Sequence, residues 1–235
     1  MHKVSFKEVD AFNKMSAQHL LLLAEERAGE HVDYSHIGNP DLKKYNLVWV
    51  IASIRAHFKD FPSNYEQINV TTWPGKTRKI FYPRYARIDD INGDTLAQIS
   101  IVWSLFDYQK RSISFIDAKK IRYYENIKEK EVYPLAKKQV KIEGGKTYKY
   151  TPQFHDFDGN GHVNNIKYID WVYDYLGRDY LSKHRLDTIE INYLREIRKT
   201  EPIDIHIKQE DNSFKVMISK EEEIYVTMNL DFIDI

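Results

Sequence analysis

The feature that most constrains the fold is a series of elements that the sequence lays out twice. Each half of the 235-residue chain contains one long apolar stretch with helical character, followed by several short runs that alternate like β-strands. A helix and a sheet each have one apolar surface to bury, and packing the helix on the sheet buries both. The repetition lies in the order of elements rather than in residue identity, and it predicts two tandem α+β units.

In the first half, residues 16–31 (SAQHLLLLAEERAGEH) are apolar on most sides and predict a largely buried helix with Ser16 as its N-cap. The Asn92-Gly93 pair predicts a hairpin turn, because Asn and Gly tolerate the positive φ angles that tight turns need. Strand-like runs are expected at residues 68–73, 85–88, 96–106 and 113–116.

In the second half, a helix is expected over 163–181, where apolar residues recur at spacings of three and four. Strands are expected at residues 188–197, 203–208, 214–219 and 224–232. The last run places Ile224, Val226, Met228, Leu230 and Phe232 on one face. Each half therefore predicts a long central helix wrapped by a curved antiparallel sheet, and the fold class is α+β with two tandem hot-dog domains.

The segment between the two halves has a different composition. Residues 117–148 are rich in charge, lack clean periodicity and end in Gly144-Gly145, which is typical of a partly helical connection. We therefore expect an N-terminal domain over 1–125, a linker over 126–148 and a C-terminal domain over 149–235.

Composition narrows the functional classes. Lys and Arg together number 35, as do Asp and Glu, so overall charge gives no reason to expect nucleic acid as a partner. The chain has no cysteine, which excludes disulfides, a thiol nucleophile and thiolate zinc sites. The first twelve residues lack the apolar core of a signal peptide, and no apolar run is long enough to span a bilayer. We expect a soluble, cytoplasmic protein.

The stretch FHDFDGNGHVNN, residues 154–165, concentrates the chemically useful side chains. Four of its residues match the start of an EF-hand calcium loop, namely Asp156, Asp158, Asn160 and Gly161. The position that must hold a bidentate glutamate is Lys167, however, and Pro152 argues against a helix before the loop. A calcium loop is therefore disfavoured.

A mononuclear metal site is also disfavoured. His155, His162 and Asp158 could supply three ligands, but no second histidine pair accompanies them in the sequence. We expect neither a metal nor another cofactor.

Two interpretations of this stretch remain open from the residues alone. In the first, a carboxylate, an imidazole and an amide gather at a helix N-terminus, where the N–H groups of Val163 and Asn164 would stabilise an oxyanion. Gly159 and Gly161 would let a substrate approach the backbone. In the second, Asp158 and Asn160 only cap the helix.

The segment DFDGNGHVNNIKYIDW (156–171) resembles the D-x-N-x-H-V-N-N-x-x-Y-x-x-W pattern of the acyl-ACP thioesterases of plants and bacteria, which are double hot-dog proteins. The matching residues are Asp158, Asn160, His162, Val163, Asn164, Asn165, Tyr168 and Trp171. INYLREI (191–197) resembles the strand on which that family carries an Arg-Glu pair. Weaker similarity over 49–76 and 93–107 extends the resemblance to nearly the whole chain.

The resemblance implies a catalytic set of Asp158, Asn160, His162 and Glu196, the last lying 34 residues after His162. Glu196 would act as general base toward water, His162 and Asn160 would position the water or the carbonyl, and Asp158 would orient them. An Asp158 nucleophile that forms an anhydride is an open variant. The alternative role of Glu196 is a surface ion pair with Arg195 or Arg198. Glycines at 159 and 161, where the family often has bulkier residues, suggest a looser loop.

The function implied is hydrolysis of acyl-ACP to free fatty acid in fatty acid biosynthesis. The alternatives are an acyl-CoA thioesterase and a non-catalytic acyl-binding protein. Candidate substrate-binding residues are Trp49, Trp73, Trp103, Asn164 and Asn165, although strand tryptophans are more often plain core. Without the plant targeting extension, a bacterial-type cytoplasmic enzyme is expected, as a monomer or homodimer.

Two basic clusters are candidates for docking the acidic acyl carrier protein. They are Lys76, Arg78 and Lys79, and Lys119, Lys120 and Arg122. For either cluster alone, ordinary solvated charge is the competing interpretation.

Overall fold

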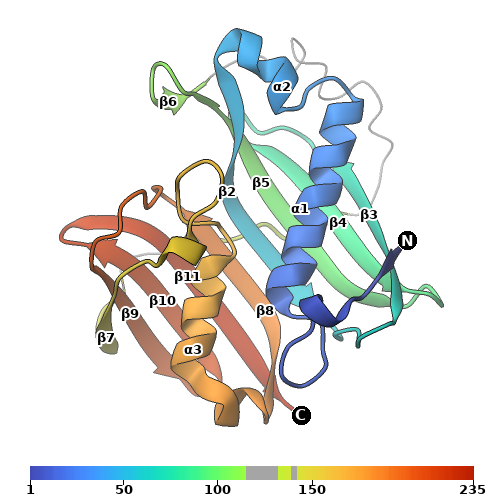
Figure 1. Ribbon diagram of the computed structural model, residues 1–235, viewed down its shortest axis with the longest axis vertical. Coiled ribbons are helices and arrows are strands. Elements are labelled where there is room, and N and C mark those ends of the chain that lie inside the picture. Colours follow the sequence, from blue (N-terminus) through green and yellow to red (C-terminus); the bar gives the residue numbers. More distant parts are fainter. Residues whose placement is uncertain (115–131, 139–141) are drawn as a thin grey trace. The chain divides into compact units, whose positions relative to one another are not determined.

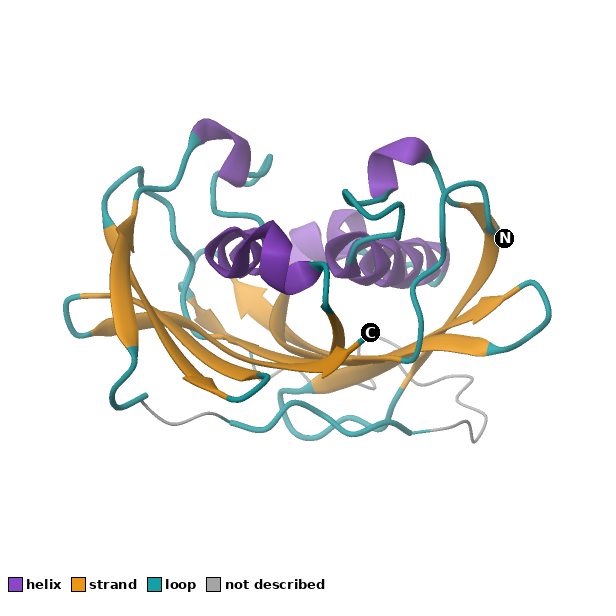
Figure 2. Cartoon of the chain, turned by 90° about the horizontal axis from the view of Figure 1, so that it is seen from below, coloured by secondary structure: helices purple, strands orange, loops and turns teal. Residues whose placement is uncertain are grey.

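The computed structural model describes residues 1–114, 132–138 and 142–235 (Figure 1). Contacts among these residues group the chain into two units, Met1–Leu135 and Ala136–Ile235. In each unit, one long helix lies on one face of that unit's antiparallel strands (Figure 2). The predicted α+β class with two tandem hot-dog units is confirmed. No helix in the described part of the chain is both long enough and apolar enough to cross a bilayer.

The first unit is built on antiparallel strands that carry helix α1 (Ala17–Tyr34) on one face. Hydrogen bonding orders the strands as β1 (His2–Lys3), β3 (Gln67–Pro74), β4 (Tyr82–Asp90), β5 (Thr95–Asp107) and β2 (Leu47–Phe58). A short β6 (Ser112–Ile113) pairs with β5, and α2 (Asn39–Leu42) precedes β2.

Local signals in this unit produce the expected structures. The Ser16 hydroxyl accepts a hydrogen bond from the His19 N–H at 3.3 Å, so the predicted N-cap is confirmed. At the β4–β5 turn, the Asp90 N–H donates to the Asp94 carbonyl at 2.9 Å, and Gly93 has a φ of +93°. The predicted hairpin is therefore present, with glycine at a position that side chains disfavour.

The second unit carries helix α3 (Lys167–Leu181) on its strands. Hydrogen bonding orders these as β8 (His184–Tyr193), β11 (Glu223–Asp234), β10 (Ser213–Lys220), β9 (Ile203–Glu210) and β7 (Lys146–Tyr150). The predicted alternation of β11 is confirmed for Val226, Met228, Leu230 and Phe232, which are all buried, whereas Ile224 is only partly buried.

Two predicted boundaries near the candidate site are wrong. Helix α3 begins at Lys167 rather than Val163, because the Asn164 side chain accepts from the Ile166 N–H at 3.1 Å and forms a turn there. Strand β8 ends at Tyr193, so Glu196 lies on the loop after the strand and not on the strand itself.

The connection between the units is described only in part. Part of the expected linker, residues 126–131 and 139–141, lies outside the described residues. The rest of it before β7, residues 132–138 and 142–145, forms no helix. Residues 146–148, which the sequence assigned to the linker, belong to strand β7 and pair with β9. The Lys137 N–H donates to the Glu190 carboxylate at 3.3 Å, which ties the connection to β8 of the second unit.

Glu25 on α1 is a partly buried acid that has no hydrogen-bond partner among the described residues. Its Oε1 is shielded from solvent and accepts no hydrogen bond. Burial raises the pKa of the Glu25 carboxyl from 4.5 to about 8, and the charge of neighbouring Glu26 adds to the rise. Between these pH values the unfolded chain releases this proton while the folded chain retains it. The free energy of unfolding must therefore fall as pH rises through this window.

We expect the Glu25→Gln variant to remove this loss of stability. Its melting temperature should equal that of the parent near pH 4.5 and exceed it by about 3 °C or more at pH 9. Thermal unfolding followed by circular dichroism across this range measures the difference. Glu26→Gln, which removes an exposed charge next to it, is the control and should give a much smaller effect. A difference between Glu25→Gln and parent that does not change with pH would contradict the assignment.

Candidate active site

The loop that carries the site is anchored by the buried carboxylate of Asp156. Its oxygens accept hydrogen bonds from the Tyr150 hydroxyl at 2.8 Å, the Gln153 N–H at 2.7 Å and the Trp171 Nε1–H at 3.3 Å. These donors belong to β7, to the start of the loop and to α3. Asp156 therefore fixes the loop to the elements on both sides of it, and its oxygens are used structurally.

Removing this anchor should destabilise the second unit. Asp156→Ala leaves three donors without their acceptor, and we expect the free energy of unfolding to drop by about 3 kcal/mol. Urea denaturation measures the drop. Asp170→Ala, which breaks a half-exposed ion pair with Lys167 on α3, is the control and should cost less than about 1 kcal/mol. Equal costs for the two variants would show that Asp156 is not an anchor.

The tip of the loop is a tight turn that gathers three of the four predicted catalytic residues. The Asp158 N–H donates to the His162 carbonyl at 2.9 Å, and the Gly161 N–H donates to the Asp158 carbonyl at 3.0 Å. Gly161 has a φ of +75°, which glycine adopts without strain. The Asn160 N–H donates to Asp158 Oδ1 at 2.8 Å. Asp158, Asn160 and His162 are thus held by local backbone bonds.

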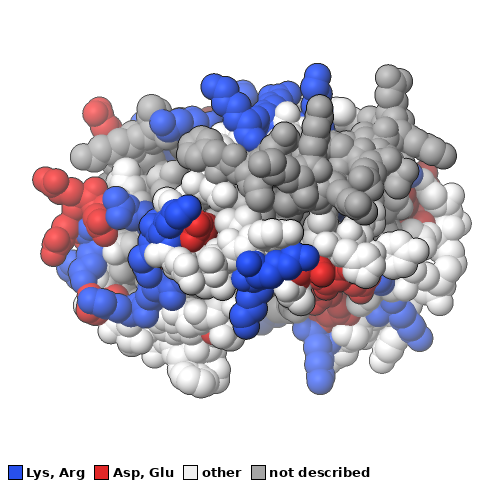
Figure 3. Space-filling model, turned by 90° about the horizontal axis from the view of Figure 1, so that it is seen from above, with Lys and Arg blue, Asp and Glu red and all other residues white. Residues whose placement is uncertain are grey.

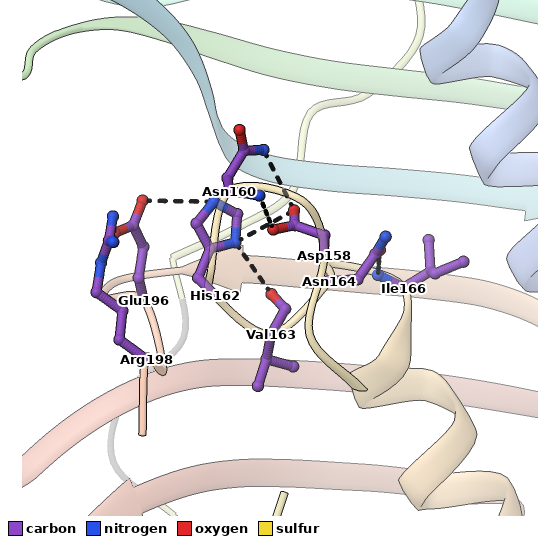
Figure 4. A network of polar contacts seen from close by, with 8 residues as sticks. All are labelled: Asp158, Asn160, His162, Val163, Asn164, Ile166, Glu196 and Arg198. Atoms are coloured by element: carbon purple, nitrogen blue, oxygen red, sulfur yellow. Dashed lines mark hydrogen bonds and ion pairs between the residues drawn. The ribbon is translucent and has the colours of Figure 1, made fainter. Parts of the chain in front are cut away.

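The imidazole of His162 lies between the two carboxylates of the predicted set (Figure 4). Its Nδ1 is 3.4 Å from Asp158 Oδ2 and 3.3 Å from the Val163 carbonyl oxygen. Both neighbours are acceptors, so we assign the proton of the neutral ring to Nδ1. The Nε2 atom is then an acceptor, and it faces Glu196 Oε1 across 3.8 Å. This gap is too long for a direct hydrogen bond and suits a bridging water.

Glu196 reaches the site from the loop after β8. That loop is held at two places, because the Leu194 N–H donates to the Tyr225 carbonyl at 2.8 Å and the Ile197 carbonyl accepts from the Val163 N–H at 2.8 Å. The carboxylate is 41% exposed and also pairs with Arg198, whose Nη2 lies 2.6 Å from Oε2. Glu196 therefore lies close to His162, as a role in the site requires, and also forms the ion pair that the sequence offered as the alternative.

The predicted oxyanion donors are already occupied. The Val163 N–H donates to the Ile197 carbonyl, and the Asn164 N–H donates to the Asp156 carbonyl at 2.8 Å. The expectation that these two groups would bind a developing negative charge is therefore wrong. Within the described part of the chain, the next N–H along, that of Asn165, has no acceptor. It is a free backbone donor just before the start of α3.

Tyr168, the second residue of α3, contributes a further donor near the carboxylates. Its ring is buried against Trp171, with centroids 5.1 Å apart. Burial raises the pKa of the Tyr168 hydroxyl, and the negative charges of Glu196 and Asp158 raise it further. The sequence marked Tyr168 only as part of the motif, because nothing in its spacing showed that its hydroxyl lies near both acids.

The three tryptophans proposed to bind substrate do not share one environment. Trp49 and Trp103 pack with the cluster that contains Tyr82, whereas Trp73 packs with Tyr85. Tyr82 and Tyr85 are three residues apart on β4, so their side chains project from opposite faces of the sheet. Trp73 therefore lies on the other face, and a pocket lined by all three tryptophans is not formed.

The side chains considered for a metal site have other roles. His155 is exposed and stacks edge-on against Phe154, and Asp156 anchors the loop. Across the described residues, no group of three or more histidine, aspartate or glutamate side chains is placed to hold a metal ion.

Known structures share this fold. An acyl-ACP thioesterase from Bacteroides thetaiotaomicron superimposes with a TM-score of 0.89 at 20% identity, covering 99% of this chain and 96% of that one. A 12:0-ACP thioesterase from Umbellularia californica superimposes with a TM-score of 0.84 at 18% identity, covering 100% of this chain and 96% of the other. At these identities the match establishes the architecture.

Sequence comparisons add the family. The chain is 28% identical over 203 residues to the acyl-[acyl-carrier-protein] hydrolase FATB2, chloroplastic, of Cuphea viscosissima. It is 27% identical over 204 residues to the palmitoyl-acyl carrier protein thioesterase, chloroplastic, of Arabidopsis thaliana. Each match covers 80% of this chain but only 49% of the relative, so the chain spans about half the length of these relatives. The model of the acyl-ACP thioesterase N-terminal domain matches residues 1–124, and that of the C-terminal domain matches 139–234. The chain belongs to the acyl-ACP thioesterase family.

Proposed function

We propose that this protein hydrolyses the thioester of a fatty acyl group carried on acyl carrier protein and releases the free fatty acid, as a step of fatty acid biosynthesis. Family membership supports the substrate class. The observation that carries the reaction type is the row of Asp158, His162 and Glu196, in which Nε2 and Oε1 face each other across 3.8 Å. A cytoplasmic location and a monomeric or homodimeric state remain predictions.

The row supports a direct attack by water. A water between His162 Nε2 and Glu196 Oε1 donates one hydrogen bond to each, which leaves its oxygen lone pairs free toward the thioester carbonyl. As the oxygen bonds to the carbonyl carbon, Glu196 takes the proton. Collapse of the tetrahedral intermediate breaks the carbon–sulfur bond, and the departing thiolate recovers the proton from Glu196. The products are the fatty acid and the thiol of the carrier.

The oxyanion that develops on the carbonyl needs donors, and two donors in the described part of the chain have no acceptor, the Asn165 N–H and the Tyr168 hydroxyl. The Asn165 N–H stands at the positive end of the α3 dipole. The raised pKa of Tyr168 keeps its hydroxyl protonated, so this group can donate a hydrogen bond. A preorganised donor of this kind lowers the barrier by about 2.7–4 kcal/mol in comparable sites. Asn165 thus takes the role that the sequence assigned to Val163 and Asn164.

Asp158 fits an orienting role better than a nucleophilic one. Its Oδ1 accepts from the Asn160 N–H, and its Oδ2 lies 3.4 Å from both Asn160 Nδ2 and His162 Nδ1. Both oxygens are thus engaged in holding the turn and the imidazole tautomer. A single turnover in ¹⁸O-labelled water tests the nucleophilic route, because label in the Asp158 carboxylate can arise only from an anhydride that water opens at the Asp158 carboxyl carbon.

Replacing the proposed base is the principal test. Glu196→Gln keeps the shape of the side chain but cannot accept a proton, and kcat should fall by roughly 10²–10⁴-fold with melting temperature unchanged. Release of free thiol from acyl-ACP measures turnover. Glu201→Gln, in the same loop but paired with Lys199 and Lys220, is the matched control and should retain parent turnover. Parent-like turnover in Glu196→Gln would remove the role of Glu196.

The same assay separates the alternative functions. Acyl-ACP and acyl-CoA compared at matched chain length show which carrier is used, and the absence of thiol release with either would favour an acyl-binding protein. A binding protein would gain nothing from a polarised imidazole facing a carboxylate, and this argues for catalysis.

The carrier protein is acidic, so its dock should be basic and unpaired. Lys76, Arg78 and Lys79 on the β3–β4 loop are exposed, and none pairs with a described carboxylate. The other cluster proposed from the sequence, at residues 119–122, lies outside the described residues. On the face drawn in Figure 3, basic and acidic side chains are interspersed. A dock on that face would therefore rely on individual ion pairs with the carrier protein rather than on a broad positive potential.

Changing these three residues to Gln tests the dock. KM for acyl-ACP should rise about 5–10-fold at low salt, with a weaker salt dependence, while kinetics with acyl-CoA stay unchanged. Three lysines that already have acidic partners provide the control variant, namely Lys149, Lys208 and Lys215. An equal rise in KM for both carriers, or in the control variant, would rule out this loop as the dock.

A further inference from the structure

The side chain of Glu196 faces a positioning problem that its backbone does not solve. The loop is fixed before it by the Leu194 N–H bond to Tyr225 and after it by the Val163 N–H bond to the Ile197 carbonyl. The carboxylate, however, extends from this backbone on a flexible side chain and is 41% exposed. Water would compete for both oxygens, and rotation about the side-chain torsions would carry Oε1 away from His162.

Arg198 supplies the missing restraint. Its Nε donates to Glu196 Oε2 at 2.8 Å, and its Nη2 lies 2.6 Å from the same oxygen (Figure 4). Two nitrogens of one planar group thus hold one oxygen, while Oε1 is left toward His162 Nε2. The two oxygens of Glu196 therefore have separate partners, one fixed by a cation and the other directed at the site.

We propose that Arg198 is a positioning residue: it holds Oε2 of Glu196 so that Oε1 faces His162 across the space where water would attack. This inference rests on the function proposed above and adds a residue to its machinery. A shift of about 1 Å in a reacting group can lower a rate by two orders of magnitude, so a restraint on this carboxylate has a large kinetic effect.

The chemistry of the pair requires arginine in particular. The guanidinium presents its donors in a rigid planar fork, so that Nε and Nη2 approach the carboxylate together. A lysine at the same position would keep the charge but would donate from a single mobile atom. The ion pair itself is half exposed, and pairs of this kind contribute little to folding. Loss of Arg198 should therefore affect turnover and leave stability nearly unchanged.

Kinetics of three variants test the proposal. Arg198→Gln should lower kcat by 10-fold or more while KM stays within twofold of the parent, and Arg198→Lys should recover only part of the loss. Arg195→Gln is the matched control, because Arg195 lies in the same loop but pairs with Glu223 at 2.9 Å. A kcat for Arg198→Gln within twofold of the parent, or an equal loss in Arg195→Gln, would overturn the proposal.

A structural measurement tests the same point without relying on activity. In crystals of the parent protein, Glu196 should adopt one conformer with Oε1 toward His162, and in crystals of Arg198→Gln it should be displaced or occupy several conformers. An unchanged Glu196 conformer in the variant would show that Arg198 does not hold it. If the parent hydrolysed no acyl thioester, the proposed function would fail, while this comparison would still decide the role of Arg198.

Discussion

One backbone hydrogen bond, from the Val163 N–H to the Ile197 carbonyl, joins the two loops that form the candidate site. His162 precedes the donor, and Glu196 precedes the acceptor. The bond therefore brings together the two backbone segments that carry the imidazole and the carboxylate, although His162 and Glu196 lie 34 positions apart in the sequence. Because the Val163 N–H is used in this way, it cannot serve a substrate.

The three acids near the loop differ in how much of their bonding capacity the protein itself uses. Asp156 is buried, with three donors on its two oxygens, and fixes the loop. Asp158 is partly exposed and holds the turn and the imidazole. Glu196 is the most exposed, and one of its oxygens makes no hydrogen bond within the described structure. A carboxylate with a free oxygen is the one that can accept a proton during a reaction.

The sequence predicted those features whose causes are local. Ser16 caps α1 and Gly93 closes the hairpin because the partners of each lie within four residues. The start of α3 was placed four residues too early, because the Asn164 side chain accepts from the Ile166 N–H and forms a turn before the helix. Trp73 was grouped with the other tryptophans because alternation gives two faces but does not say which faces of separate strands coincide.

The candidate site shows the same division. The motif brought Asp158, Asn160 and His162 together because they share one turn, and the family resemblance supplied Glu196. Neither source showed which oxygen of Glu196 faces the site, since that depends on where Arg198 places its guanidinium.

The arrangement of acceptors at the centre of the site argues for water as the attacking species. With its proton on Nδ1, the neutral ring of His162 presents a lone pair at Nε2, and Glu196 presents another at Oε1. Two acceptors that face each other at 3.8 Å repel unless a donor lies between them. Water has two O–H groups and can satisfy both, whereas a hydroxyl side chain has one. The arrangement of His162 Nε2 and Glu196 Oε1 would therefore also orient the attacking water.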